Sequence, residues 1–360
     1  MDIHQATKSY EDWMRQSMPV IDSQLRSKHR KMRLDPFQFF RGTYYRWAQL
    51  WPELCPDLLG SSKVLCVGDL HVGSFGTWRD VEGRLCWGVD DFDESYPLPY
   101  TNDLVRLATS VKLLIQTGDL TIKLKDACDA FADGYQQTLK QGGSPIVLAE
   151  NNDHMERLGI KAIKPPPDFW KRLNIRPSVG SNLPPGARRA LEKMLPEAKL
   201  DYKVVRREAG MGSMGQERFV AISRWRGGCI AREAKRMLPA ASVWLDGAVA
   251  HCQLYYQTAI TSAVRCPDPY QGIVGPWLVR RLSPDSNPID IGALPKERDE
   301  DVLLHAMGSE IANVHLGSRR QVQRILKDLS RKKSKWLRAA AKVMAKTVVR
   351  EWAEYKNANR

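Results

Sequence analysis

The chain has 360 residues, of which 43% are hydrophobic and 27% charged, and its formal net charge is +14. This composition fits two domains or one bilobal domain, and it excludes an intrinsically disordered chain. The seven cysteines are odd in number and form no C-x-x-C pair, which argues against a secreted disulfide framework and favours a reduced, cytoplasmic compartment. No run of about 18 apolar residues is present, so we expect no membrane span.

The first part of the chain reads as helices separated by short strands. Helical patterns are predicted over about residues 1–33, after Asp35-Pro36, over 102–114 and over about 122–142. Asp35 and Pro36 have the pattern of an N-cap followed by proline at the first helical position. Strands are predicted at Lys63–Val67 and on both sides of a turn at Glu82-Gly83.

A proline-rich stretch over residues 160–188 is the best candidate for a boundary, and the pattern changes after it. Strands joined by glycine turns are predicted at 202–207, 218–223, 229–233 and 277–282. Helices are predicted over Ser242–Thr261 and from about Glu297 onward.

Two blocks in the first half carry residues suited to catalysis. In the loop Gly68–Gly76, Asp69 and His71 follow a predicted strand, at the end where α/β sites usually lie. This loop can also be read as a turn with a capping aspartate. The acidic loop Asp90–Glu94 would hold a divalent cation or a basic partner, and its alternative reading is a solvated loop.

A third block, Gly210–Gly215, has the pattern G-x-G-x-x-G. A predicted strand follows where a dinucleotide-binding turn would need a helix, so the block favours a kinase glycine-rich loop over ATP phosphates. Arg232 and Lys235 then both stand where the phosphate-binding basic residue is expected. The alternative is that both are exposed surface charges.

The spacing of these residues matches the catalytic segments of protein kinases. Ser74 lies five residues after Asp69, where kinases hold a second magnesium ion, and Asp91 begins a segment in the place of the magnesium-binding D-F-G. Asp103 matches the helix-opening aspartate that braces the catalytic loop in aminoglycoside-phosphotransferase-like enzymes. His315 ends a segment similar to the kinase helix before that loop, and we expect it to be a packing or capping residue.

The blocks occur in the reverse of the kinase order, because the catalytic and acidic loops precede the glycine-rich loop and its basic residue. We therefore predict an α+β, bilobal, protein-kinase-like fold that is circularly permuted, with a helical catalytic lobe and a small antiparallel β-sheet lobe. Neighbouring termini make such a rearrangement possible. The predicted parts are a helical lobe with both loops (1–160), a proline-rich linker or insertion (161–200), a β-rich nucleotide-binding lobe (201–285) and helices completing the helical lobe (286–360).

The chain resembles the bacterial family called domain of unknown function 2252, and through it the protein-kinase-like superfamily. The resemblance runs from Phe39 to about Leu316 and is anchored by FFRGT, GDLHVGSFG, DDFDE, GMGSMG and AREAK. It implies a kinase-like fold and the use of ATP, without indicating a substrate. The chain departs from this pattern at Ser74, where asparagine is usual, and at Arg232, where lysine is common.

We therefore expect an ATP- and Mg²⁺-dependent phosphotransferase whose acceptor is open. The expected catalytic residues are Asp69 and His71, the metal ligands Asp91, Ser74 and Asp93, and the nucleotide-binding residues Gly210, Gly212, Ser213, Gly215, Arg232 and Lys235. The departures motivate an alternative, a nucleotide-binding pseudokinase without turnover. A metallophosphoesterase is disfavoured because its two-metal site needs more histidine and aspartate ligands than the sequence provides.

Residues 319–360 carry a net charge of +11. The apolar residues of this segment lie close to one helical face: Leu337, Ala341, Met344, Val348, Trp352 and Tyr355. The basic residues lie on the other: Lys335, Arg338, Lys342, Lys346 and Arg350. We expect an amphipathic helix packed on the body with a solvated basic face, and an anion- or nucleic-acid-binding helix is the alternative. The expected partners are a nucleotide and an acceptor, and the oligomeric state stays open.

Overall fold

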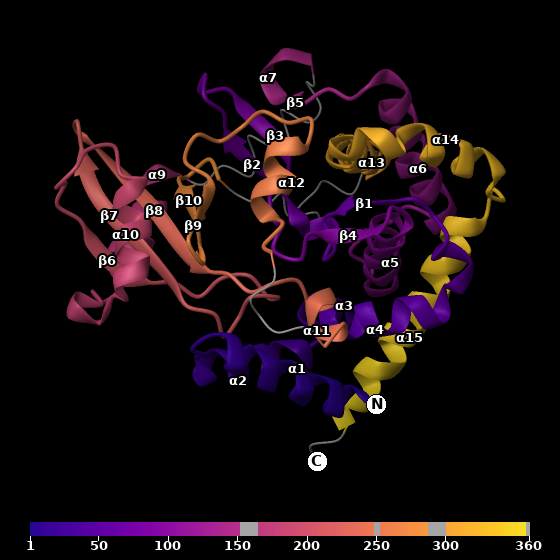
Figure 1. The fold of residues 1–360 in the computed structure, drawn as a ribbon, viewed down its shortest axis with the longest axis horizontal. Helices are drawn as coiled ribbons and strands as arrows, with labels where there is room; N and C mark the ends of the chain where they lie inside the picture. Colours follow the sequence, from indigo (N-terminus) through magenta and orange to yellow (C-terminus); the bar gives the residue numbers. More distant parts are fainter. Residues whose placement is uncertain (152–164, 248–252, 287–299, 358–360) are drawn as a thin grey trace.

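The computed structural model describes residues 1–151, 165–247, 253–286 and 300–357, which form an α+β structure with small antiparallel sheets. A five-stranded sheet lies at one side of the molecule, a group of helices lies at the other, and two smaller sheets lie between them (Figure 1). No helix within the described residues is long and apolar enough to cross a membrane.

Four α-helices precede the first strand: α1 (Ile3–Ser17), α2 (Asp22–Met32), α3 (Pro36–Gly42) and α4 (Tyr44–Leu54). The segments predicted as helical over about 1–33 and after Asp35-Pro36 are therefore helical, and each is divided into two helices. The predicted cap of α3 is confirmed, because the Asp35 carboxylate accepts a hydrogen bond from the amide of Gln38 at 2.8 Å and Pro36 opens the helix. Helix α1 packs on α15 (Trp336–Asn357), so the two ends of the chain meet, and the His4 ring stacks on Tyr355 with centroids 5.3 Å apart.

The two small sheets surround the two predicted loops. Strand β1 (Lys63–Cys66) pairs with β4 (Tyr96–Pro99), and β3 (Leu85–Val89) lies between β2 (Phe75–Arg79) and β5 (Ile146–Val147). Helices α5 (Thr101–Thr117) and α6 (Leu124–Gln141) follow the acidic loop and confirm the predicted helices there. Both end at a glycine in the left-handed conformation, which is a common helix stop.

The five-stranded antiparallel sheet has the order β6-β7-β8-β10-β9. Its strands are β6 (Lys203–Arg206), β7 (Arg218–Trp225), β8 (Gly228–Arg236), β9 (Gly272–Val274) and β10 (Trp277–Leu282). Successive strand residues point to opposite faces. One face packs against α10 (Pro185–Lys193) through residues such as Phe219, and the other packs against α9 (Pro166–Asn174) through residues such as Val220. The described part of the stretch predicted as a linker therefore folds onto this sheet.

The single helix predicted over Ser242–Thr261 is wrong. The chain forms α11 (Ala241–Leu245) and α12 (Tyr256–Ser262), and residues 253–255 between them are not helical. The predicted helical C-terminal part is found in α13 (Glu300–His315), α14 (Val322–Arg331) and α15, whereas its first residues, 297–299, lie outside the described residues.

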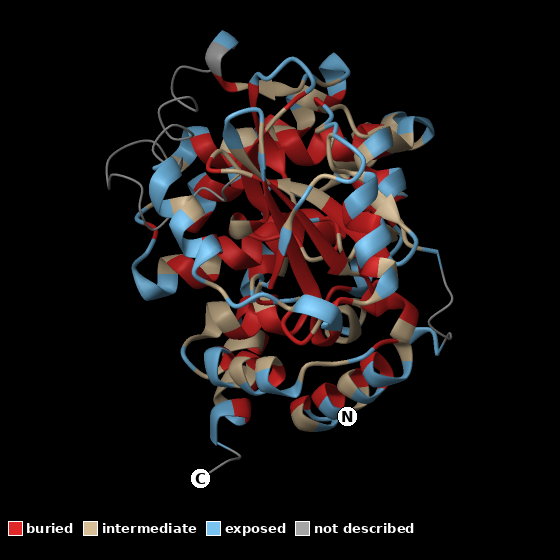
Figure 2. Cartoon of the chain, turned by 90° about the vertical axis from the view of Figure 1, so that its left-hand side faces the viewer, coloured by how far each residue is buried: buried red, intermediate tan, exposed pale blue. Residues whose placement is uncertain are grey.

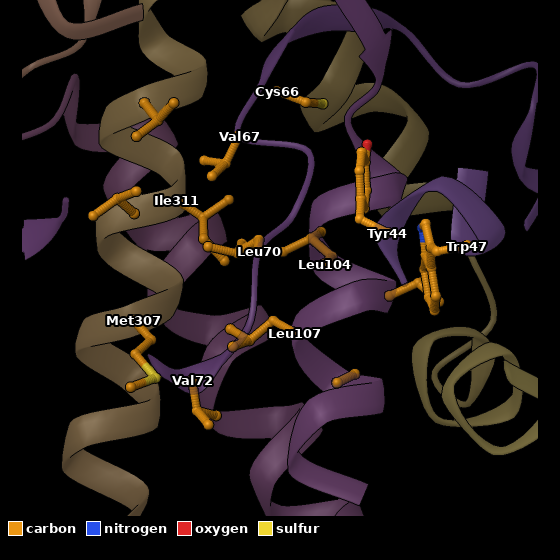
Figure 3. Packing of buried hydrophobic residues seen from close by; sticks show 14 of the residues in the cluster. Tyr44, Trp47, Cys66, Val67, Leu70, Val72, Leu104, Leu107, Met307 and Ile311 are labelled. Atoms are coloured by element: carbon orange, nitrogen blue, oxygen red, sulfur yellow. The ribbon is translucent and has the colours of Figure 1, made fainter. Parts of the chain in front are cut away.

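Buried residues gather in the central strands and on the inward faces of the helices around them (Figure 2). The main core includes residues from α4, α5 and α13, and the loop after β1 passes through it. Figure 3 shows Leu70 and Val72 of that loop between Met307 and Ile311 of α13 and Leu107 of α5. The backbone that carries Asp69 is therefore held by buried apolar side chains on both sides.

Candidate functional site

Asp103 fixes the loop that carries Asp69. Its buried carboxylate accepts hydrogen bonds from the backbone N–H groups of Val67 at 2.7 Å and Gly68 at 3.1 Å. His315 Nε2 lies 3.1 Å from the same carboxylate, and its Nδ1 lies 2.8 Å from the Tyr135 hydroxyl. Asp103 thus braces the loop as expected, and His315 packs and hydrogen-bonds within the core.

The Asp69 carboxylate is oriented by Arg106, which sequence reasoning missed. The Arg106 Nε donates to Asp69 Oδ1 at 3.0 Å, and the guanidinium is enclosed by the rings of Phe40, Tyr44 and Trp47, with centroids 4.0–4.9 Å from Cζ. Burial raises the pKa of Asp69, while the charge of Arg106 acts against that rise. Arg106 follows Asp103 by three residues in the same predicted helix, so the two side chains lie on the same side of that helix. This spacing was the one sequence feature that could have placed Arg106 near Asp69.

His71 and Ser74 are turned into their own loop. The Nδ1 of His71 accepts from the amide of Gly73 at 3.0 Å, and the Ser74 hydroxyl donates to the carbonyl of Asp69 at 3.2 Å. Burial, with Arg41 and Arg106 nearby, holds the pKa of His71 well below its usual value, so its ring is neutral. Neither side chain lines the cleft described below, so this geometry gives them a structural role in shaping the turn.

The acidic loop supplies carboxylates of different character. Burial raises the pKa of Asp90 to about 6 and that of Glu94 to about 8. Glu94 accepts a hydrogen bond from the amide of Ala241 at 2.6 Å, whereas Asp91 is exposed. Asp93 forms an ion pair with Lys235. Within the described chain, neither Asp91 nor Glu94 takes part in an ion pair.

Strand β8 separates the two candidate basic residues. Lys235 points toward the acidic loop, and burial lowers its pKa to about 8 although Asp91 and Asp90 act against that shift. Arg232 lies on the opposite face, where its Nε donates to the carbonyl of Met194 at 2.9 Å and its guanidinium lies over the Tyr270 ring. Because Lys235 lies three positions after Arg232, a strand must send these side chains to opposite faces. The geometry brings Lys235 to the site and leaves Arg232 away from it.

The glycine-rich loop joins β6 to β7 and lies against Asp69. A Cβ placed on Gly212 would come within 3.4 Å of Asp69 Oδ2, so the two segments approach closely although 143 residues separate them. The Ser213 hydroxyl accepts a hydrogen bond from Arg218 at 2.9 Å. Strand, glycine loop and strand are therefore arranged as the sequence predicted.

Glu233 ties the base of the glycine-rich loop and was also missed. Its fully buried carboxylate binds Arg207 at 2.6 Å and Arg218 at 2.9 Å, on the two sides of that loop, and Arg280 at 2.9 Å. Its pKa is lowered by these three cations, which outweigh the effect of its burial. Glu233 and Lys235 share one face of β8, so the same strand anchors the loop and presents the cation.

These segments line a narrow cleft with a volume of about 30 Å³. The residues that line it come from the catalytic loop, the acidic loop, the glycine-rich loop and the end of β8: Asp69, Asp91, Asp93, Glu94, Gly212, Ser213, Gln216, Met237 and Leu238. Four of them are carboxylates. Carboxylate oxygens are ligands that divalent cations prefer, but among the described residues no three of these four carboxylates bring oxygen atoms within 4.8 Å of one another.

The basic C-terminal helix packs as expected. Leu337, Ala341, Met344 and Tyr355 of α15 are buried, and Val348 and Trp352 pack against core clusters. Of the predicted basic face, Lys335, Lys342, Lys346 and Arg350 are exposed and Arg338 is partly buried.

Residues 20–165 match the model of a family described as "Uncharacterized protein conserved in bacteria (DUF2252)". This match includes the loop Gly68–Gly76 and the acidic loop Asp90–Glu94, whereas Gly210–Gly215 and Lys235 lie outside it. No curated protein and no solved structure matches the chain.

Proposed function

We propose that the protein is an ATP- and Mg²⁺-dependent phosphotransferase of the protein-kinase type, acting on an acceptor that carries a hydroxyl group. The observation that carries the proposal is the convergence of three distant segments on one cleft: the loop with Asp69, the loop with Asp91 and the loop Gly210–Gly215. Phosphoryl transfer is catalysed mainly by positioning and by neutralising charge, which are the tasks that these three kinds of segment serve in kinases.

Each lining residue has a role in this proposal. Asp69, oriented by Arg106, accepts the proton of the acceptor hydroxyl as its oxygen attacks the γ-phosphorus and the bond to ADP breaks. Asp91, with Asp93 or Glu94, would hold Mg²⁺, which supplies charge neutralisation to the phosphates when bound. The backbone of the glycine-rich loop covers the phosphates.

Lys235 and Asp93 form an ion pair across the cleft. Both side chains are largely buried, with 6% and 20% exposed, so a phosphate that arrives between them meets a cation with few competing waters. A short rearrangement would turn Lys235 from Asp93 to the phosphates and leave Asp93 available to Mg²⁺. Arg232 has no role here because it lies on the other face of the sheet.

The reversed order of the segments is consistent with a circularly permuted kinase-like fold. In that arrangement, a chain with the usual kinase order would be cut before the part that corresponds to residues 1–160. Its original ends would be joined between the acidic loop and the glycine-rich loop. The packing of α1 on α15 brings the present ends together, as a rearrangement of this kind requires.

A second candidate is a nucleotide-binding protein without turnover. It is favoured by the position of Ser74, whose hydroxyl is bonded to the carbonyl of Asp69 and does not line the cleft, so the second magnesium position of kinases lacks its usual ligand. The two candidates share the nucleotide site and differ in ATP consumption, which magnesium-dependent release of ADP would distinguish.

Calorimetric titration of ATP with and without Mg²⁺ tests the proposal. We expect binding by the wild type that requires Mg²⁺, and a loss of affinity of at least tenfold in Asp91→Ala. Asp133→Ala is a matched control, because this exposed aspartate lies on α6 away from the cleft. Absence of MgATP binding by the wild type, or equal binding by both variants, would refute the proposed function.

A further inference from the structure

Helix α2 runs along the glycine-rich loop and contacts it at both ends. At the start of α2, the Ile21 amide donates to the carbonyl of Gly215 at 2.9 Å, and the Gln24 side chain accepts from the Gly215 amide at 3.2 Å. One turn further, Lys28 Nζ donates to the carbonyl of Gly212 at 3.2 Å. Near its end, Lys31 Nζ lies 3.8 Å from Glu208.

These contacts come from a single stripe of the helix. Ile21, Gln24, Lys28 and Lys31 are spaced by three, four and three residues, so they lie on one face of α2. Their partners lie between Gly215 and Glu208, and Lys31 Nζ also lies 3.7 Å from the Met214 sulfur. The helix therefore follows the whole loop and does not merely touch it at one point.

Apolar packing leaves little room between α2 and the loop. Gly215 has φ +100°, where other residues are strained, and a Cβ there would come within 2.7 Å of the Leu25 side chain and force it to shift. Met211 and Met214 of the loop share a buried cluster with Met32 at the end of α2. Together these contacts restrain a segment that its glycines would otherwise leave with large conformational freedom.

Lys28 is the unusual member of the stripe because its charge is buried. Only 3% of the residue is exposed, and among the described residues its ammonium has one hydrogen bond and no ion pair. Burial lowers its pKa, whereas the carboxylates of Glu11, Asp69 and Glu94 raise it. A buried ammonium without an ion pair is costly, and the contacts that offset this cost are the Gly212 carbonyl and the Tyr45 ring, whose centroid lies 6.0 Å from Nζ.

We propose that α2 is a brace that sets the distance between the glycine-rich loop and Asp69, and that Lys28 is the residue of α2 that positions the loop. This inference rests on the proposed nucleotide site. Glu233 holds the two sides of the loop at its base, whereas α2 holds its tip at Gly212 and Gly215. A loop fixed at both places presents its backbone amides to the phosphates without having to be ordered when the nucleotide binds.

Two measurements on the full chain test the brace. Hydrogen exchange over residues 207–217, without ligand, should be at least tenfold faster in Lys28→Met and in Gln24→Ala than in the wild type, with exchange in β7 and β8 unchanged. Arg26→Met is the matched control, since this exposed arginine on the same helix has no described contact with the loop, and it should exchange like the wild type. Unchanged exchange over 207–217 in both test variants would overturn the inference.

Nucleotide binding supplies the second measurement and separates positioning from general damage. Lys28→Met should bind MgATP at least tenfold more weakly than the wild type, while adenosine, which lacks phosphates, should bind within twofold. An equal loss for both ligands would overturn the assignment of Lys28 as a positioning residue. If the wild type itself failed to bind MgATP, the proposed function would fall, and the exchange result would still decide whether α2 braces the loop.

Discussion

Replacing Asp103 with alanine would remove the acceptor that holds the backbone before Asp69. Four donors lose their partner: the amides of Val67 and Gly68, the Asn102 side chain at 3.2 Å and the His315 ring. Each buried donor left without an acceptor costs about 1–3 kcal/mol, and the two amides have no alternative acceptor in their strand-to-loop turn. We therefore expect the free energy of unfolding to fall by about 4 kcal/mol.

Urea unfolding followed by circular dichroism measures this loss, provided that the variants share one m-value. Asp103→Asn is the informative companion, because its amide oxygen can still accept from one backbone N–H while its NH₂ group faces the other. It should lose about half as much as Asp103→Ala. A loss below about 1 kcal/mol for the alanine variant would show that the loop is held by the packing of Leu70 and Val72 alone, and the bracing role of Asp103 would be refuted.

Three further results follow from the burial and geometry described above. Glu94 has a pKa of about 8 in the folded protein and releases its proton near 4.5 in the unfolded chain, so the free energy of unfolding should fall as the pH rises between these values. Glu94→Gln should flatten this dependence in a series of melting temperatures. Added MgCl₂ should stabilise the wild type more at pH 8 than at pH 6. Gly68→Ala should cost roughly 3 kcal/mol or more in urea unfolding, because Gly68 has φ +84° and a Cβ would meet the Glu94 carbonyl at 2.2 Å; a cost near zero would contradict this geometry. In α15, Met344→Ala should cost about 2–5 kcal/mol, whereas the exposed Lys342→Glu should stay within about 0.5 kcal/mol, and the reverse order would show that the basic face, not the apolar one, holds the helix.

The local elements were predictable where the pattern was periodic and bounded by clear signals. The Asp35-Pro36 cap gave the start of α3, and the alternating strands on both sides of Gly210–Gly215 gave β6 and β7. The predicted helix over 242–261 failed because apolar residues alone do not specify a continuous helix, and the chain leaves α11 after Leu245. Gly247 follows α11 with φ +66°, a left-handed conformation that commonly stops a helix.

The choice between Arg232 and Lys235 shows how an error of three residues at a strand end obscures a site. The predicted strand stopped at Glu233, whereas β8 continues to Arg236. Once both basic residues belong to the same strand, the period of two places them on opposite faces, and Glu233 shares the face of Lys235. The sequence would therefore have predicted which of the two basic residues faces the site, but only if the end of β8 at Arg236 had been known.

The spacing of Asp69 and Ser74 was insufficient for a different reason. Five residues separate them as in a kinase catalytic loop, but the turn Val72–Ser74 lets the Ser74 hydroxyl bond the Asp69 carbonyl and also accept from the His71 amide at 3.1 Å. Short polar side chains often satisfy nearby backbone groups in this way. Spacing gives the distance along the chain, whereas the direction of the side chain depends on such local bonds.

The brace formed by α2 could not be predicted from motifs, because it joins residues near the start of the chain to a loop nearly 200 residues later. The same loop is also reached from the other end of the chain, since Tyr355 shares the buried cluster of Met211 and Met214. Met32 of α2 and Tyr355 of α15 therefore belong to one buried cluster with Met211 and Met214 of the glycine-rich loop. If the loop covers a nucleotide, α2 helps to set the distance between the loop and Asp69. In a kinase with the usual order of motifs, another segment would have to hold the loop in this way.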